Sequence, residues 1–196
     1  MGERKVKWLI RIRVLGVIQK TSCQIMKYSI FVSFAIILTS FVSYGQDTTQ
    51  LIRTPYKLVV AVDKNSVYEE DIKATPYVLP DNTIQLYPGE IVYIEVEQEN
   101  GIIKSMTAVK ENINPSKTLI LSFTQTDKKK VHELMTLKVT NPFKQQLIYN
   151  ATIFIMKHNK WVKTNVYPVE AGLSGFEIWP DIITSIGLGK WIFKNQ

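Results

Sequence analysis

Residues 91–109 read IVYIEVEQENGIIKSMTAV, and this stretch decides the fold class. In residues 91–99 apolar side chains alternate with polar ones, mostly glutamates, and this period of two indicates a strand with one buried and one exposed face. Asn100-Gly101 follows at once, and residues 102–109 have the composition of a returning strand. A type I′ turn needs positive φ at both central residues, which Asn and Gly adopt readily, so the stretch predicts a β-hairpin.

Similar segments recur along the rest of the chain, separated by turn residues such as Asn114-Pro115 and Asn141-Pro142. About eight strands with turn signals every 8–12 residues predict an all-β fold, an antiparallel immunoglobulin-like β-sandwich, with a closed small barrel as the alternative. The other expected strands are residues 58–62, 83–87, 118–126, 134–141, 147–157, 161–167, 182–188 and 190–194.

Three segments depart from the strand pattern. Ser66-Val67-Tyr68-Glu69 has the spacing of a capping box, which predicts one short helical turn. Lys128-Lys129-Lys130 lies between two apolar runs and is expected to be a solvated turn. Residues 168–180, PVEAGLSGFEIWP, have no period and are expected to cross the sandwich as an ordered segment, with Trp179 mostly buried.

The N-terminal part resembles a bacterial export signal. Lys27 precedes a mostly apolar run over residues 28–44, and Ser43-Tyr44-Gly45 places small residues at the positions that signal peptidase reads. Residues 26–45 are therefore expected to form a signal helix that is cleaved before Gln46, with a retained membrane anchor as the alternative. Either outcome places the domain outside the cytoplasm, in the periplasm or beyond it, and the only membrane contact expected is through an uncleaved leader.

The leader divides the chain into three expected parts. Residues 1–25 are interpreted as an upstream extension that is not native, because translation from Met26 gives the usual short positive region; a basic amphipathic arm is the alternative. Residues 46–196 are expected to be a single β-sandwich domain. The only cysteine, Cys23, lies ahead of this domain, which therefore contains no disulfide.

The charge distribution argues against a nucleic-acid partner. The net charge is +7, but seven of the basic residues lie in residues 1–45, and residues 46–196 hold 17 basic and 16 acidic side chains. Affinity for nucleic acid depends on clustered Lys and Arg that neutralise phosphates, and the expected domain has no such surplus.

No catalytic or metal-binding pattern stands out in the expected domain. Ser174 lies in GLSG, which lacks the second glycine position of a hydrolase elbow. His132 and His158, even with Glu133, lack the spacing of zinc ligands. We therefore expect no enzyme activity, no cofactor and no metal. An enzyme whose site is built from scattered residues is the alternative.

Aromatic side chains are enriched near the C-terminus, where the domain's three tryptophans fall in the last 36 residues. Exposed aromatic rings stack on sugars or anchor protein partners, so these residues are the candidates for partner binding. Rings that plug one end of the sandwich are the alternative. The candidates are Trp161, Tyr167, Phe176 and Trp179.

The C-terminal third resembles a group of uncharacterised exported bacterial immunoglobulin-like domains. The resemblance covers residues 137–180 and rests on four stretches within them, and Tyr167 stands where the pattern has a cysteine shortly before Pro168-Val169. It implies a sandwich fold and export, and it implies no activity. The matching stretches are Val139-Thr140-Asn141-Pro142, Leu147-Ile148-Tyr149-Asn150-Ala151, Pro168-Val169 and Glu177-Ile178-Trp179-Pro180.

Taken together, these patterns predict an exported non-catalytic β-sandwich protein that acts as a binding or structural module in the cell envelope. Its expected partner is another envelope protein or a glycan. A membrane-tethered accessory subunit is the second alternative, and it depends on whether the leader is retained.

Overall fold

The computed structural model describes residues 50–195, which belong to one compact unit, Thr48–Gln196. The expected leader at residues 26–45 and the segment before it lie outside the described residues. The strands are β1 (Tyr56–Asp63), β2 (Ser66–Ile72), β3 (Ile84–Leu86), β4 (Glu90–Glu99), β5 (Ile102–Val109), β6 (Thr118–Lys128), β7 (Val131–Thr140), β8 (Gln146–Ile155), β9 (Lys160–Thr164), β10 (Ser174–Trp179) and β11 (Ile183–Lys194), with one 3-10 turn, η1 (Met156–His158).

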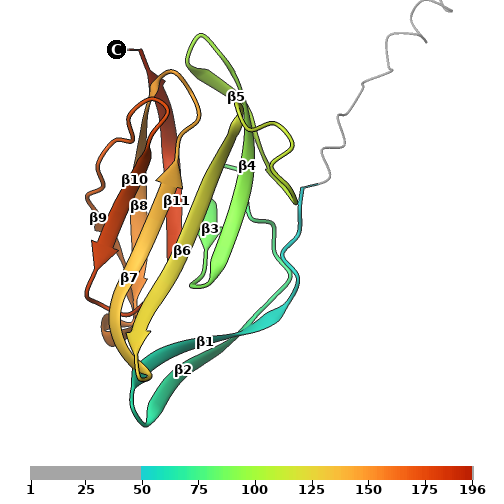
Figure 1. The fold of residues 1–196 in the computed structure, drawn as a ribbon. Coiled ribbons are helices and arrows are strands. Elements are labelled where there is room, and N and C mark those ends of the chain that lie inside the picture. The colour runs from blue at the N-terminus through green and yellow to red at the C-terminus, as the bar shows by residue number, and fades with distance from the viewer. Residues whose placement is uncertain (1–49, 196) are drawn as a thin grey trace, which may run out of the picture. The chain divides into compact units, whose positions relative to one another are not determined.

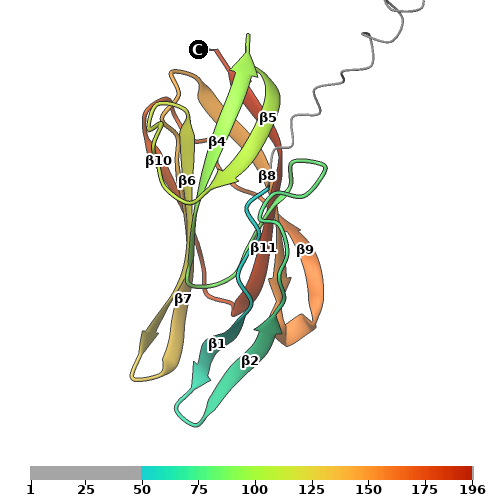
Figure 2. The same cartoon turned by 90° about the vertical axis from the view of Figure 1, so that its right-hand side faces the viewer.

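The strands form three sheets, and every pairing is antiparallel. The five-stranded sheet has the order β10-β7-β6-β4-β5 and the four-stranded sheet the order β3-β11-β8-β9. These two sheets are the layers of a sandwich, and β1 and β2 form a separate hairpin at the end opposite to the C-terminus (Figures 1 and 2). The expected all-β antiparallel class is confirmed.

The core lies between the two layers and follows from the period of two. On β4 three alternate residues, Val92, Ile94 and Val96, point inward and are buried, while the glutamates between and after them remain accessible. The facing sheet contributes Tyr149, which stacks on Trp191, and Phe193, which contacts Phe143. Complete burial of such a side chain contributes roughly 1.5–3 kcal/mol, and this shared interior holds the two sheets together.

Both two-residue turns in the five-stranded sheet have the expected backbone. Asn100 and Gly101 have φ of 53° and 81°, which confirms the predicted turn between β4 and β5. A Cβ at Gly101 would lie 2.9 Å from the Phe193 carbonyl oxygen, so this turn also packs against β11. Lys129 and Lys130 form the β6–β7 turn with φ of 52° and 67°, which confirms a solvated turn at the lysine run.

The predicted helical turn at Ser66–Glu69 is wrong, because this segment belongs to β2. β1 is a β-branched strand that requires a partner, and β2 pairs with it from Tyr56↔Ile72 onward. Leu58 and Val60 of β1 then form a small satellite core with Ile72. Pairing and burial therefore override the local capping signal.

The prediction for residues 168–180 is wrong in one respect, because part of this segment is a strand. Ser174–Trp179 is a strand, β10, that pairs with β7 at the edge of the five-stranded sheet. The strand lacks the usual pattern because apolar Phe176 and Ile178 face outward, whereas Gly175 and Glu177 face inward. Trp179 is mostly buried, as expected, because it packs against the main core.

Strand boundaries also differ from the sequence expectation, most clearly in the C-terminal half of the chain. The two strands expected after residue 182 are one strand, β11, interrupted by a bulge at Lys190, which has φ of 54°. The strand expected to reach residue 157 ends at Ile155, where η1 begins. The strand expected to reach residue 167 ends at Thr164, and its continuation forms the β9–β10 connection.

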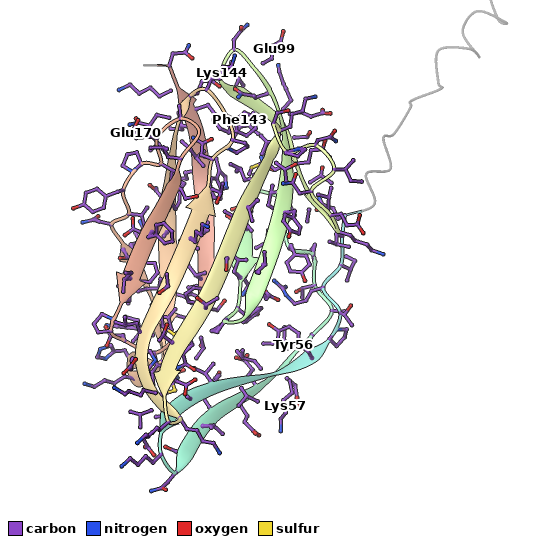
Figure 3. The ribbon with its side chains drawn as sticks, in the orientation of Figure 1. Tyr56, Lys57, Glu99, Phe143, Lys144 and Glu170 are labelled. Carbon is purple, nitrogen blue, oxygen red and sulfur yellow. The ribbon has the colours of Figure 1, made fainter. Side chains whose placement is uncertain are left out.

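Buried Asn141 holds that connection against the end of the sandwich. Its Nδ2 donates to the carbonyl oxygens of Gln145, Val169 and Glu170, and its Oδ1 accepts from the Phe143 amide. Figure 3 shows Phe143 and Glu170 at this same end. The connection between the two edge strands, β9 and β10, is thereby fixed at the left edge of Figure 1.

Arg53 anchors the β1–β2 hairpin to the sandwich. Its side chain is 1% exposed, and Nε and Nη2 donate to the two Glu90 carboxylate oxygens at 2.6 and 3.1 Å. The guanidinium lies over the rings of Tyr77 and Tyr87, 4.3 and 4.9 Å from their centroids. Tyr56, on the sandwich side of β1 in Figure 3, donates its hydroxyl hydrogen to the same carboxylate.

Candidate functional site

A polar groove lies on the outer face of the four-stranded sheet, and we call it the sheet groove. Its volume is about 520 Å³, and its lining comes from the loop before β3, from β8, from β9 with the residue after it, and from β11. The sheet groove lies over the middle of the sheet and not along an edge, because β8 and β11 are the two central strands.

The floor of the sheet groove exists because β11 has no side chains there. Gly187 pairs with Thr152 and Gly189 pairs with Asn150, so two glycines lie beside two outward polar residues. A Cβ on Gly187 would lie 3.1 Å from the Thr152 hydroxyl oxygen, and one on Gly189 would lie 3.0 Å from the Thr83 hydroxyl oxygen. Any larger residue at either position would meet these hydroxyl groups and narrow the groove.

The walls stand on the two outer strands and on the bulge. Lys163 lies opposite Thr152 on β9, and Asn165 follows on the same face. Asp81 and Thr83 form the opposite wall, ahead of β3. Lys190 stands at the end of the groove, where the β11 bulge directs its side chain outward, as bulges commonly do at binding sites.

Asp81 is hydrogen-bonded to Thr83, its neighbour in the same wall of the groove. Its two carboxylate oxygens accept from the Thr83 amide at 3.0 Å and from the Thr83 hydroxyl at 2.8 Å. Both hydrogen bonds lower the pKa of the Asp81 carboxyl from its ordinary value, and the bond from the Thr83 hydroxyl has the larger effect. Lys163 and Lys190, in contrast, enter no ion pair among residues 50–195. The groove therefore carries two ammonium groups and one carboxylate, and its net charge is positive.

Two features extend the binding surface beyond the groove. Trp161 points outward on β9, two residues before Lys163, and its ring meets Phe154 edge-on at 5.5 Å between centroids. A second hollow of about 330 Å³ shares Asp81 and Lys190 with the groove and continues toward Ile192. Together they make an elongated surface with an aromatic ring at one end and an apolar hollow at the other.

A larger hollow of about 550 Å³ lies beside Glu90 and Tyr56, but its polar groups serve the fold. Glu90 accepts four hydrogen bonds, two from Arg53 and one each from the Tyr56 hydroxyl and the Tyr87 amide. A carboxylate with this many donors has little capacity left for a ligand. The sheet groove is therefore the better candidate site.

The structure does not gather the four predicted partner-binding aromatics into one site. Trp161, 49% exposed, lies on the outer face of the four-stranded sheet beside the groove. Phe176, 58% exposed, faces outward on the five-stranded sheet, with Lys138 5.6 Å from its ring centroid. Tyr167 projects from the connection with 83% of its surface exposed, and Trp179 packs between β10 and β9, where its Nε1 donates to Thr164 Oγ1.

The groove residues themselves were missed by sequence reasoning. They come from four segments of the chain that become neighbours only through the register of β8, β9 and β11. The one local signal was Gly187-Leu188-Gly189, two glycines on the same face of an otherwise apolar strand. Glycine inside a strand weakens it and often marks a close approach of a ligand or another backbone.

Comparison of the chain with protein-family models, with curated proteins and with solved structures finds no match. Within residues 50–195, no three or more His, Cys, Asp or Glu side chains come together as metal ligands, and no helix has the length and apolar character of a membrane span.

Proposed function

We propose that this protein is an exported, non-catalytic β-sandwich of the immunoglobulin-like type that binds a ligand in the cell envelope through the sheet groove. The observation that carries the proposal is the preformed polar groove over Gly187 and Gly189, in the middle of a rigid sheet. Binding sites of this kind are concave and largely formed before the ligand arrives.

The chemistry of the groove supports binding more than catalysis. A general acid at neutral pH needs a raised carboxyl pKa, whereas hydrogen bonds from Thr83 lower the pKa of Asp81. The remaining side chains are mostly amides and hydroxyls, among them Asn150, Thr152 and Asn165. Such groups donate and accept hydrogen bonds, and they orient a ligand without exchanging protons with it.

Export is part of the proposal and rests on the leader-like sequence of residues 26–45. Expression of the full chain in a bacterial host, followed by fractionation and mass spectrometry, tests it. We expect the protein outside the cytoplasm with Gln46 as its first residue. A product that stays in the cytoplasm with residues 26–45 intact would remove the envelope from the proposal.

The binding site is tested by co-sedimentation of the exported protein with purified envelope fractions. Gly187→Val places a branched side chain in the groove floor, where its Cβ lies 3.1 Å from the Thr152 hydroxyl oxygen, so Thr152 must shift and sedimentation should be lost. The melting temperature of the variant shows whether it folds. Thr124→Val is the matched control, since it introduces the same residue at an exposed position of β6 in the other sheet. Equal sedimentation of the two variants, at unchanged melting temperature, would exclude the groove as the site.

A further inference from the structure

The sheet groove carries a charge arrangement that its polar floor alone does not require. Lys163 stands on the β9 side and Lys190 at the β11 bulge, so two ammonium groups flank the same space. Neither has a carboxylate partner among the described residues, and both oxygens of Asp81 are occupied by Thr83. The two lysines outnumber the single carboxylate, Asp81, so the groove has a net positive charge available to an anionic ligand.

The backbone conformation of Lys190 also supports a ligand site at the groove. Lys190 has φ of 54°, a left-handed conformation that side chains other than glycine, Asn and Asp seldom adopt. It sits in the bulge between Gly189 and Ile192, where β11 departs from regular pairing with β8. Residues held in such conformations cluster at ligand sites, because the surrounding structure must maintain them.

The shape of the groove and its other side chains restrict the chemical class of the ligand further. The groove and the second hollow meet at Asp81 and Lys190, so the occupant is elongated. Asn150, Thr152 and Asn165 present amides and hydroxyls across its length. Trp161 lies about 7 Å along β9 from Lys163 on the same face, because outward residues recur every second position of a strand.

We propose that the ligand of the sheet groove is an acidic oligosaccharide, a chain of sugar rings that carries carboxylates. One carboxylate pairs with the ammonium groups of Lys163 and Lys190, the amides and hydroxyls of the floor bond the sugar hydroxyls, and one ring stacks on Trp161. This inference rests on the proposed function, since it names the ligand class of the same groove.

A matched pair of sugars tests the charge. Tetragalacturonate and galactotetraose share ring stereochemistry and differ in a carboxylate against a hydroxymethyl group. We expect calorimetric titration of the exported protein to show binding of tetragalacturonate at least about fivefold tighter, because a hydrogen bond to a charged group is worth about 1 kcal/mol more than a neutral one. The difference should shrink at high salt, since these lysines are exposed. Equal affinities would overturn the acidic class.

Variants assign the effect to the two lysines. Lys163→Gln with Lys190→Gln removes both charges, keeps a polar side chain at each position and should lower the affinity for tetragalacturonate to that for galactotetraose. Lys64→Gln with Lys128→Gln removes the same charge from exposed turn and strand-end positions near the hairpin tips and should change neither. If the control double variant weakens binding as much as the groove variant, general charge attraction explains the binding and the assignment is wrong.

Two measurements distinguish a saccharide site from a site for any small anion: titration with inorganic phosphate, and titration of the Trp161→Ala variant. Phosphate should bind far more weakly than tetragalacturonate, and Trp161→Ala should weaken the sugar roughly threefold to tenfold while leaving phosphate unchanged. Phosphate that binds as tightly as the sugar would make the site an anion site. Failure of both sugars, while envelope co-sedimentation still depends on Gly187, would reject the ligand class and leave the proposed function standing.

Discussion

The buried ion pair between Arg53 and Glu90 makes a quantitative prediction about stability. The Arg53 side chain is 1% exposed and that of Glu90 is 9% exposed. Glu90→Gln removes the only carboxylate that contacts this guanidinium in the described part of the chain and leaves its positive charge buried. Breaking a buried pair in this way costs about 3–5 kcal/mol, a large share of the 5–15 kcal/mol that stabilises a typical domain.

Arg53→Met should cost less, toward the lower end of that range. The stranded Glu90 carboxylate keeps two donors, the Tyr56 hydroxyl and the Tyr87 amide. The remaining cost of this variant includes the lost hydrogen bonds from the Arg53 guanidinium to Thr75 Oγ1 and to the Gln85 carbonyl oxygen. The double variant has neither charge, so its cost should be smaller than the sum of the single costs by about 2–3 kcal/mol.

Urea unfolding followed by tryptophan fluorescence measures all three free energies. Lys57→Met with Glu69→Gln is the matched control, because this exposed pair at 2.7 Å joins β1 to β2 and should leave the unfolding free energy nearly unchanged. Single losses below about 1 kcal/mol, or a double variant equal to the sum of the singles, would refute the anchoring role of Arg53.

Three further predictions concern single sites. Lys129→Asn with Lys130→Gly should raise the unfolding free energy by about 1 kcal/mol or more, because both lysines occupy left-handed backbone; a loss of stability in urea would contradict this. Burial raises the pKa of the Tyr149 hydroxyl, so its stabilising contribution is complete below pH ~10 and is lost as pH rises through the folded pKa; stability should fall above pH ~10, and Tyr149→Phe should reduce the fall. Trp191→Ala should cost about 3–5 kcal/mol in thermal or urea melts, whereas Trp161→Ala should cost about 0.5 kcal/mol or less, and similar losses would contradict their different burial.

The sequence was informative where the physical cause is local. The β4–β5 turn follows from Asn100-Gly101, whose preferred backbone matches the twist of the strands on either side. The lysine turn was predictable because charged residues between two apolar runs remain in water. Alternation on β4 predicted its buried face correctly.

The sequence misled where a distant partner decides the outcome. Ser66–Glu69 has a helix-start signal, yet pairing with β1 and burial of Ile72 against Leu58 and Val60 outweigh it. Trp161 and Phe176 are close in sequence, but they belong to edge strands of different sheets and point outward from opposite layers. Proximity along the chain therefore did not indicate one site.

The sheet groove could not be predicted for the same reason. Its floor needs Gly187 beside Thr152 and Gly189 beside Asn150, which is a property of the register between β8 and β11. A register shifted by one residue would turn these side chains toward the core. Only the two glycines, on one face of a strand, signalled from sequence that something approaches this sheet.

Photo-cross-linking in living cells tests the central claim, ligand binding in the sheet groove, most directly. A photo-reactive residue at Asn165, on the groove wall, is compared with one at Thr124, on the outer face of the other sheet. The groove position should give a cross-linked envelope adduct that Gly187→Val abolishes, and Thr124 should give none. An adduct at Thr124 with none at Asn165 would place the binding surface on the five-stranded sheet and contradict the account.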